Sequence, residues 1–245
     1  MTSYAELAPM VDLEVRVDPR TVLKASTSKR FTGTSVARVD LPDKVAGRAR
    51  FIHDLRLPGQ LFARVIRQPS PGAELISVSD PPPGAGMQLI RDGSFLAVVG
   101  PDESLVVRCA EKVRAASTWL EQDTLPDEND LDRYLRTGPH ETITVVDEMD
   151  GNAPGDPGST RTLSATYSRP FIAHAAMAPS CAVARWTQDG QLLVWSHSQG
   201  IYPLADALAG ALGLDPPNVH VEHVEGAGCY GHNGADDVAL DAALV

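Results

Sequence analysis

Four glycines fall within nine positions of one short stretch of this sequence, between Gly226 and Gly234. A thiol, Cys229, and an aromatic ring, Tyr230, stand among them. Glycine has no side chain to block an approach to the main chain, so a loop of this composition can bring peptide N–H groups close to an anion such as a phosphate. The chemistry that these residue types support is therefore binding through main-chain hydrogen bonds.

The residues on either side of this loop are typical of regular elements. The run Val219–Val224 enters it as an expected strand, and the alanine-rich run 235–245 leaves it as an expected helix, with Asp236 and Asp237 in the first turn. A strand followed along the chain by a glycine loop and then a helix is an order of elements that occurs at anion-binding sites. The spacing is not that of a Rossmann fingerprint, and no Lys-Ser/Thr pair follows as in a P-loop. An ordinary glycine-rich turn is the alternative that these residues alone leave open.

A second polar group is predicted at the same place. Residues 191–198 form an expected strand, after which Gln199 and Gly200 lead into an expected helix that ends at Gly213. The strand at 219–224 then completes a β-α-β crossover. If the two strands are parallel neighbours, the Gln199 amide and the glycine loop share one edge of the sheet, which is where ligands bind in such units.

The elements that must support these loops indicate an α+β chain. Alternating apolar residues and turn signals predict strands at 49–52, 61–67, 75–78, 94–99 and 163–167, and a hairpin of 181–187 with 191–198 around Asp189-Gly190. A helix is expected from an N-cap at Asp102 to about Gln122, because apolar residues recur there at steps of three and four.

Composition predicts four parts along the chain. Residues 1–35 are expected to be an irregular lead-in, 36–146 a first folded domain, 147–160 an acidic linker rich in glycine and proline, and 161–245 a second domain. The sequence stops inside an expected helix without a stop signal, so we expect this second domain to be partial.

The overall charge and the cysteines exclude several classes of partner and site. The formal net charge is -11 and no cluster of lysine and arginine occurs, which argues against nucleic acid or an anionic membrane as partner. The apolar runs are too short to span a bilayer, and the first residues lack a signal pattern. The three cysteines are far apart, which fits reduced thiols in the cytoplasm and excludes a CxxC-type metal or iron–sulfur site.

Three separate motifs resemble the molybdopterin-binding large subunit of the xanthine dehydrogenase / aldehyde oxidase / carbon monoxide dehydrogenase family. Residues Arg38–Phe51 and Asp54–Gly59 resemble the opening of its α/β hammerhead domain, and His174–Pro179 resembles the entry to its first molybdopterin domain. Ser198-Gln199-Gly200, followed by Gly226–Asn233, is similar to its Gln and Gly-Gly-Phe-Gly cofactor loops. The spacing of the three motifs agrees over Arg38 to the C-terminus.

This resemblance implies an α/β hammerhead domain followed by the first part of a molybdopterin-binding domain. It implies that Gln199 donates its amide to the apical oxo ligand of molybdenum, and that Gly228, Cys229, Tyr230 and Gly231 wrap the molybdopterin, expected as the cytosine dinucleotide. The complete enzyme would hydroxylate an N-heteroaromatic compound or an aldehyde with oxygen from water, and electrons would pass to iron–sulfur clusters and FAD on partner subunits. The metal would be held by the pterin, so no protein metal ligand is expected.

Several departures keep other functions open. Ala178 stands where family members often have glutamate, and Cys229 and Tyr230 replace glycine and phenylalanine. The family's general base, a glutamate near the far C-terminus, has no counterpart here, so no catalytic residue is expected in this chain and we do not expect it to be active alone. A non-catalytic assembly or maturation module of such a complex is one alternative, and a plain phosphate-ligand binding domain is another.

Overall fold

The computed structural model describes residues 3–12, 15–16, 18–78, 86–146, 161, 163–234 and 237–245. The chain divides into two compact units, Met1–Arg48 and Ala49–Val245. The predicted linker at 147–160 lies outside the described residues. No helix within the described residues combines the length and the apolar character that crossing a bilayer requires.

The first unit contains only short helices, α1 (Tyr4–Leu7) and α2 (Leu41–Val45), besides two 3₁₀ turns, and it buries no side chain among its described residues. Its main polar cluster centres on Asp40, whose carboxylate contacts Arg38 at 2.5 Å and Lys44 at 2.8 Å. The hydrogen bonds from these two cations hold the pKa of the Asp40 carboxyl well below its usual range.

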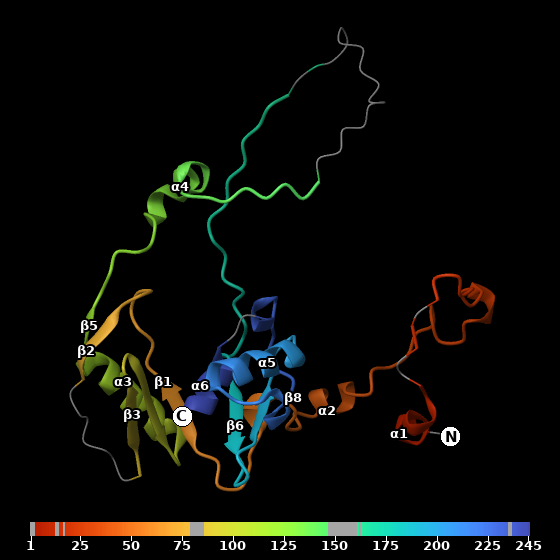
Figure 1. Ribbon diagram of the computed structural model, residues 1–245, viewed down its shortest axis with the longest axis horizontal. Helices are drawn as coiled ribbons and strands as arrows, with labels where there is room; N and C mark the ends of the chain where they lie inside the picture. Colours follow the sequence, from red (N-terminus) through yellow and green to blue (C-terminus); the bar gives the residue numbers. More distant parts are fainter. Residues whose placement is uncertain are drawn as a thin grey trace. The chain divides into compact units, whose positions relative to one another are not determined.

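The second unit begins with two antiparallel sheets and one long helix (Figure 1). One sheet has the order β1 (Phe62–Val65), β4 (Phe95–Gly100), β3 (Gln88–Asp92), and the other pairs β2 (Glu74–Val78) with β5 (Ser117–Leu120). Helix α3 (Glu103–Ala116) packs on β1 and β4. Their shared core consists of eight buried residues: Ile66, Leu75, Met87, Leu96, Val98, Val106, Ala110 and Val113.

The predicted strands at 61–67, 75–78 and 94–99 are confirmed, and so is the Asp102 cap, which accepts a hydrogen bond from the Leu105 N–H at 2.9 Å. The predicted length of the helix is wrong. It ends at Ala116, where Ser117 turns to an extended conformation and donates its hydroxyl to the Val113 carbonyl at 2.7 Å. Strand β5 follows because it pairs with β2, a long-range contact that outweighs the local helical spacing.

Two further differences concern the strands. Strand β3 is present although the sequence patterns did not single it out. The predicted strand at 49–52 is wrong, because Ile52–Asp54 is a 3₁₀ helix and the Ile52 N–H donates to the Glu225 carbonyl at 2.7 Å. A short helix, α4 (Leu131–Thr137), was also not predicted.

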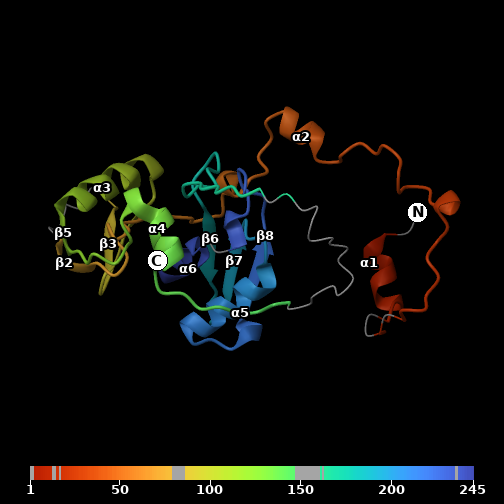
Figure 2. The same cartoon turned by 90° about the horizontal axis from the view of Figure 1, so that it is seen from above.

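The rest of the second unit is a mixed sheet with a helix crossover. Figure 2 shows β6 (Ala182–Trp186), β7 (Leu192–Ser196) and β8 (Val219–His223) side by side. Strands β6 and β7 are antiparallel, whereas β7 and β8 are parallel and joined through α5 (Ile201–Leu212). The predicted hairpin and β-α-β crossover are therefore confirmed. Gly213 ends α5 in the left-handed region at φ 68°, where glycine is favoured.

Helix α6 (Val238–Leu244) completes this half and packs on β6. The core joins it to the sheet and to α5, and consists of Leu192, Val194, Leu208, Ala209, Val219, Val221, Ala239 and Ala243. Asp237 was predicted to lie in the first turn of this helix, and that prediction is wrong, because Asp237 is the N-cap residue that precedes the first turn. Asp236, predicted in the same turn, lies outside the described residues. The predicted strand at 163–167 is wrong too, because its described residues pair with no neighbouring strand.

We predict that Leu208→Ala lowers the free energy of unfolding by about 2–5 kcal/mol, the usual result of truncating a fully buried leucine. Leu208 is 2% exposed in the core of α5, whereas Tyr202 of the same helix is 81% exposed. Tyr202→Ala is the matched control and should change stability by less than about 0.5 kcal/mol. Urea titration followed by far-ultraviolet circular dichroism measures both, and equal effects would contradict the assigned face of α5.

Candidate functional site

The sheet of β6, β7 and β8 brings the two predicted loops to one edge. Because β7 and β8 are parallel and Ser196 is paired with His223, both chains leave the sheet at the same end. The Val224 N–H continues the ladder to the Ser196 carbonyl at 2.9 Å. One step further, the Gln199 N–H donates to the Asn233 carbonyl at 3.3 Å. The predicted convergence of Gln199 and the glycine loop is therefore present in the structure.

Asn233 ties these loops together a second time. Its side chain is 5% exposed, and its Nδ2 donates to the His197 carbonyl at 3.0 Å. Asn233 therefore bonds to both residues that flank Ser198, once through its own carbonyl and once through its side chain. These two bonds of a buried residue fix the spacing between the loops, because breaking either one would take a hydrogen-bond partner away from a polar group at this edge.

His197 forms the floor beneath the glycine loop. It is 5% exposed, and its Nε2 accepts a hydrogen bond from the Cys181 N–H at 3.0 Å, so that Nε2 does not carry a proton. Gly226 lies directly on it, since a Cβ added at Gly226 would come within 2.8 Å of the His197 Cβ. This histidine has a structural role, in agreement with its predicted place at the end of a strand.

The glycine loop itself has an unusual backbone. Gly228 and Gly231 have φ of 107° and 94°, and Tyr230 between them has φ of 51°, a left-handed conformation that a residue with a side chain rarely adopts. Since Ala227 and Cys229 do not have positive φ, the sign alternates from Ala227 to Tyr230, which is the pattern that turns successive N–H groups to one side, and Gly231 is then positive again.

The N–H groups of this loop are open to a ligand. Within the part of the chain that the structure describes, no acceptor is hydrogen-bonded to the N–H of Gly228, Cys229 or Tyr230. Cys229 is used internally, because its Sγ accepts from the Gly231 N–H at 3.3 Å and its carbonyl accepts from the His232 N–H at 3.0 Å. The described residues contain no group of three or more His, Cys, Asp or Glu side chains that could hold a metal ion.

His174 holds the strained part of the loop in place. Its Nδ1 donates to the Tyr230 carbonyl at 2.6 Å, and its ring centre lies 5.4 Å from that of His232. Ala175, the residue after His174, has φ of 53°. Ala175 and Tyr230 are the two described non-glycine residues with positive φ, and the hydrogen bond from His174 to Tyr230 connects the segments that contain them. From the sequence alone, His174 can be either a hydrogen-bonded structural histidine or a residue that orients the cofactor loop. The contact with Tyr230 supports the second role, which a lone histidine in an irregular segment does not reveal.

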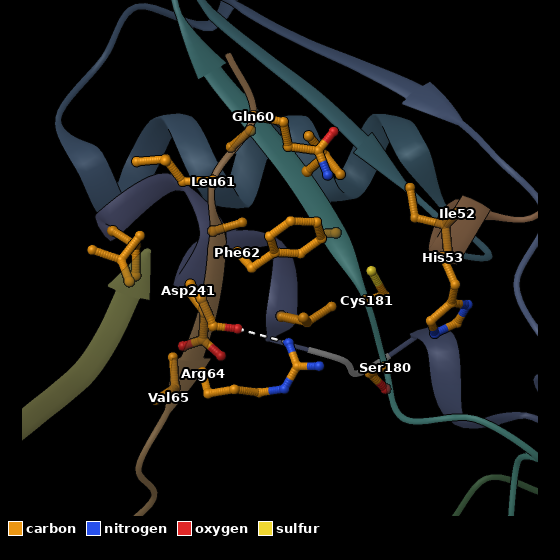
Figure 3. Close-up of a pocket in the computed structure, with 18 of the residues that line it drawn as sticks. Ile52, His53, Gln60, Leu61, Phe62, Arg64, Val65, Ser180, Cys181 and Asp241 are labelled. Atoms are coloured by element: carbon orange, nitrogen blue, oxygen red, sulfur yellow. Dashed lines mark hydrogen bonds between the residues drawn. The ribbon is translucent and has the colours of Figure 1, made fainter. Parts of the chain in front are cut away.

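A groove lies beside this edge and not over it. This groove, of about 690 Å³, runs along β1, β6 and α6, and His232 lies at its margin, whereas Gln199 and Tyr230 do not line it. Cys181 faces this groove (Figure 3), and burial raises the pKa of its thiol, so that it stays protonated at neutral pH. The candidate anion site is therefore the sheet edge with its open N–H groups, and the groove is a separate feature.

Comparison with known proteins agrees with this geometry. Residues 147–245 match the family described as molybdopterin cofactor-binding domain. Over 257 aligned residues the chain is 35% identical to a nicotinate dehydrogenase subunit of Pseudomonas putida strain KT2440, an alignment that covers 99% of this chain and 21% of that protein. It is also 26% identical to the beta subunit of isoquinoline 1-oxidoreductase from Brevundimonas diminuta, over 91% of this chain and 30% of that protein.

Solved structures share the fold. Quinoline 2-oxidoreductase from Pseudomonas putida 86 superposes with a TM-score of 0.58 at 20% identity, over 82% of this chain and 31% of that one. Carbon monoxide dehydrogenase from Oligotropha carboxidovorans superposes with a TM-score of 0.59 at 16% identity, over 86% of this chain and 33% of that one. The predicted resemblance to the molybdopterin-binding subunits of the xanthine dehydrogenase family is confirmed.

The similarity to this family has a clear extent. The chain spans between about a fifth and a third of the length of the relatives that it matches. The molybdopterin cofactor-binding domain begins at residue 147 in this alignment, and it includes both Gln199 and the glycine loop.

We predict that Asn233→Ala lowers the free energy of unfolding by about 1–3 kcal/mol, because the buried His197 carbonyl loses its donor. Gln199→Ala is the matched control. It keeps the main-chain bond to Asn233 and removes only an exposed side chain, so stability should change by less than about 0.5 kcal/mol. Chemical denaturation of both variants checks this difference, and an unaffected Asn233→Ala variant would contradict the role given to the buried amide.

Proposed function

We propose that this chain supplies part of the molybdopterin site of a molybdenum hydroxylase that acts on N-heteroaromatic compounds or aldehydes. The observation that carries the proposal is that Gln199 and the glycine loop, with its open N–H groups, lie at one sheet edge. The names of the relatives, nicotinate dehydrogenase and isoquinoline and quinoline oxidoreductases, support the N-heteroaromatic class.

The residues of the edge fit a pterin with a phosphate. A phosphate and a polar ring both need hydrogen-bond donors, and the N–H groups of Gly228, Cys229 and Tyr230 have no acceptor among the described residues. The alternating sign of φ from Ala227 to Tyr230 permits these donors to turn toward one side of the loop. An acidic chain of net charge -11 can therefore still bind an anion at this one place.

Each residue would have a distinct role toward the bound group. Gly228, Cys229, Tyr230 and Gly231 would hold it through the main chain, and Gln199 would add a side-chain amide donor from the neighbouring strand end. His174 would keep the Tyr230 peptide in its left-handed conformation, and Asn233 would keep the two loops at fixed spacing. When bound, the molybdenum–pterin group, with the cytosine dinucleotide as the proposed form, supplies the two-electron redox chemistry of the hydroxylation.

Partner subunits are part of the proposal. We propose that a further molybdopterin-binding chain completes the site, and that iron–sulfur and FAD subunits accept the electrons, so that this chain is not active alone. We also propose that residues 36–146 form an α/β hammerhead domain and that residues 161–245 form part of a molybdopterin-binding domain. We propose in addition that the assembled enzyme is cytoplasmic.

A non-catalytic assembly or maturation module is the second candidate. It is favoured by Ala178, which stands where family members often have glutamate. The two candidates differ in what Gln199 does. An assembly module needs the fold but not this exposed amide, whereas a contributor to the site needs both.

We predict that Gln199→Ala lowers turnover of the assembled enzyme about 100-fold, the usual effect of removing one preorganised donor from a reacting group. Molybdenum content, measured by mass spectrometry of the purified complex, should stay unchanged, because the glycine loop is intact. Nicotinate, quinoline and a simple aldehyde serve as test substrates. Full turnover with the variant would support the assembly module and contradict the first proposal.

We predict that Gly228→Ala lowers the molybdenum content of the complex at least about tenfold, a change equivalent to roughly 1.4 kcal/mol. Gly228 has φ of 107°, and an added Cβ would lie 2.8 Å from the Tyr230 ring, so the loop must rearrange. Gly190→Ala is the matched control, since this glycine has φ of 80° and open space around it in the hairpin at the other end of β7. Equal loss of molybdenum in both variants would show a general folding defect instead.

A further inference from the structure

A short turn from the beginning of the second unit contacts the base of the glycine loop. Residues Ile52–Asp54 form a 3₁₀ helix, and the Ile52 N–H donates to the Glu225 carbonyl at 2.7 Å. Glu225 directly precedes Gly226, the first glycine of the loop, and Val224, one residue earlier, still bonds to β7. The turn therefore holds the loop at the point where it leaves the sheet.

The sequence of this turn leaves the Ile52 N–H available for that bond. The Asp54 carboxylate accepts hydrogen bonds from the N–H groups of Phe51 at 3.0 Å and Arg50 at 3.1 Å. These two bonds lower the pKa of the Asp54 carboxyl, so it is ionised and accepts both at neutral pH. Ile52 is the first residue of the 3₁₀ helix, where an N–H has no acceptor within the helix. It donates to Glu225 instead.

Side chains of the same turn make contacts in two directions. The Arg50 Nε lies 3.7 Å from the Glu225 Oε2, so both the carbonyl and the carboxylate of Glu225 are held by the turn. The Ile52 side chain is 1% exposed and anchors the turn in the fold. On the other side, the His53 Nε2 donates to the Pro179 carbonyl at 2.8 Å, and Figure 3 shows His53 close to the residues that follow Pro179.

The segment around Pro179 also contacts the glycine loop and its floor. Earlier in this segment, His174 donates to the Tyr230 carbonyl at 2.6 Å. Later in it, the Cys181 N–H donates to the Nε2 of His197 beneath the loop at 3.0 Å. The turn is therefore bonded both to the residue that begins the loop and to the segment that holds the left-handed part of the loop.

We propose that residues 50–54, which we call the 50–54 turn, position the glycine loop for its ligand, and that the Ile52 N–H is the main positioning group. A loop whose N–H groups lack acceptors has to be held by other parts of the fold if its donors are to be oriented before the ligand binds. The contacts with Glu225 and Pro179 do this from two sides. The identity of the ligand, molybdopterin, rests on the proposed function, whereas the positioning of the loop does not.

A matched pair of variants separates the hydrogen bond of Ile52 from the packing of its side chain. Ile52→Pro removes the N–H and keeps an apolar side chain. Proline fits the first position of a helix, and Phe51 before it is already extended at φ -88° and ψ 158°, the conformation that a residue before proline prefers. Ile52→Ala keeps the N–H and removes most of the buried side chain.

Amide hydrogen exchange of the full chain, measured by mass spectrometry, reports the order of the loop without any cofactor. The bonded N–H groups of the peptide 221–234 include those of Val224, Gly231 and His232. In Ile52→Pro this peptide should exchange about threefold to tenfold faster than in the wild type, as loss of one main-chain bond predicts. Ile52→Ala should lower the urea midpoint of unfolding, and exchange of the peptide should stay within about twofold of wild type because its local opening keeps the bond.

The molybdenum content of the assembled enzyme gives the second readout. Ile52→Pro should lower it at least about threefold, because the loop then has to be ordered by the ligand itself, and Ile52→Ala should leave it unchanged.

A second pair of variants tests the contact with Pro179 and does not depend on how well Ile52→Pro folds. His53→Ala removes the donor to the Pro179 carbonyl, and exchange of the peptide 221–234 should become faster. His53→Gln keeps an N–H donor at this position and should restore the wild-type rate.

The possible failures can be told apart. Equal acceleration of exchange in Ile52→Pro and Ile52→Ala would assign the effect to packing and overturn the positioning role. Wild-type exchange in both Ile52→Pro and His53→Ala would overturn it as well. Faster exchange in Ile52→Pro, together with an assembled wild-type enzyme that holds no molybdenum, would overturn the proposed function and leave the role of the 50–54 turn standing.

Discussion

The two hydrogen bonds of Asn233 are the constraint on which the geometry of the candidate site depends. Parallel pairing of β7 and β8 decides that both strands end at the same edge, but it leaves the loops beyond them free to diverge. The Asn233 carbonyl and side chain bridge that gap, by bonding to the main chain of Gln199 and of His197. A buried residue at this place therefore holds the two loops at a fixed distance, which the pairing of the strands alone does not do.

The strain in the glycine loop is explained by the same bridge. Tyr230 adopts a left-handed backbone, which is unfavourable by about 1–2 kcal/mol for a residue with a Cβ. The His174 ring holds the Tyr230 carbonyl from one side, and the Asn233 contacts hold the following turn from the other. Strained backbone that persists because its surroundings fix it is typical of sites that must present donors in advance of a ligand. The open N–H groups of Gly228 to Tyr230 are consistent with this function.

Sequence reasoning succeeded where local signals and chain order were enough. The β-branched strand, the glycine loop and the helix that ends at Gly213 predicted the β-α-β unit, and Asp102 predicted a helix start. It failed where distant pairing decides the outcome. Ser117–Leu120 fits a helix by spacing but becomes β5 because β2 offers an edge, and Ile52 is drawn to the Glu225 carbonyl instead of to a sheet.

The candidate site also has some features that local sequence predicts and others that only distant contacts determine. The convergence of Gln199 and the glycine loop was predictable because an amide after one strand and glycines after the next are local features of the sequence. The backbone angles of Tyr230 and Ala175 were not found, since neither residue type favours positive φ. His174 stands 56 positions before Tyr230, in a segment without regular structure, so no periodicity connects the two. Contacts between irregular segments are set by the tertiary structure.

The second unit has two separate hydrophobic cores, and this determines which substitutions near the candidate site affect stability. Neither core contains Gln199, Gly228, Cys229, Tyr230 or Gly231. Their apolar residues hold the strands in register without help from the loops, so the loops can keep a strained, open conformation without unfolding the sheet. The residues that link loops to framework are His197 and Asn233, which are buried and polar. Changes at these two positions act on both stability and site, whereas changes at the loop residues act mainly on the site.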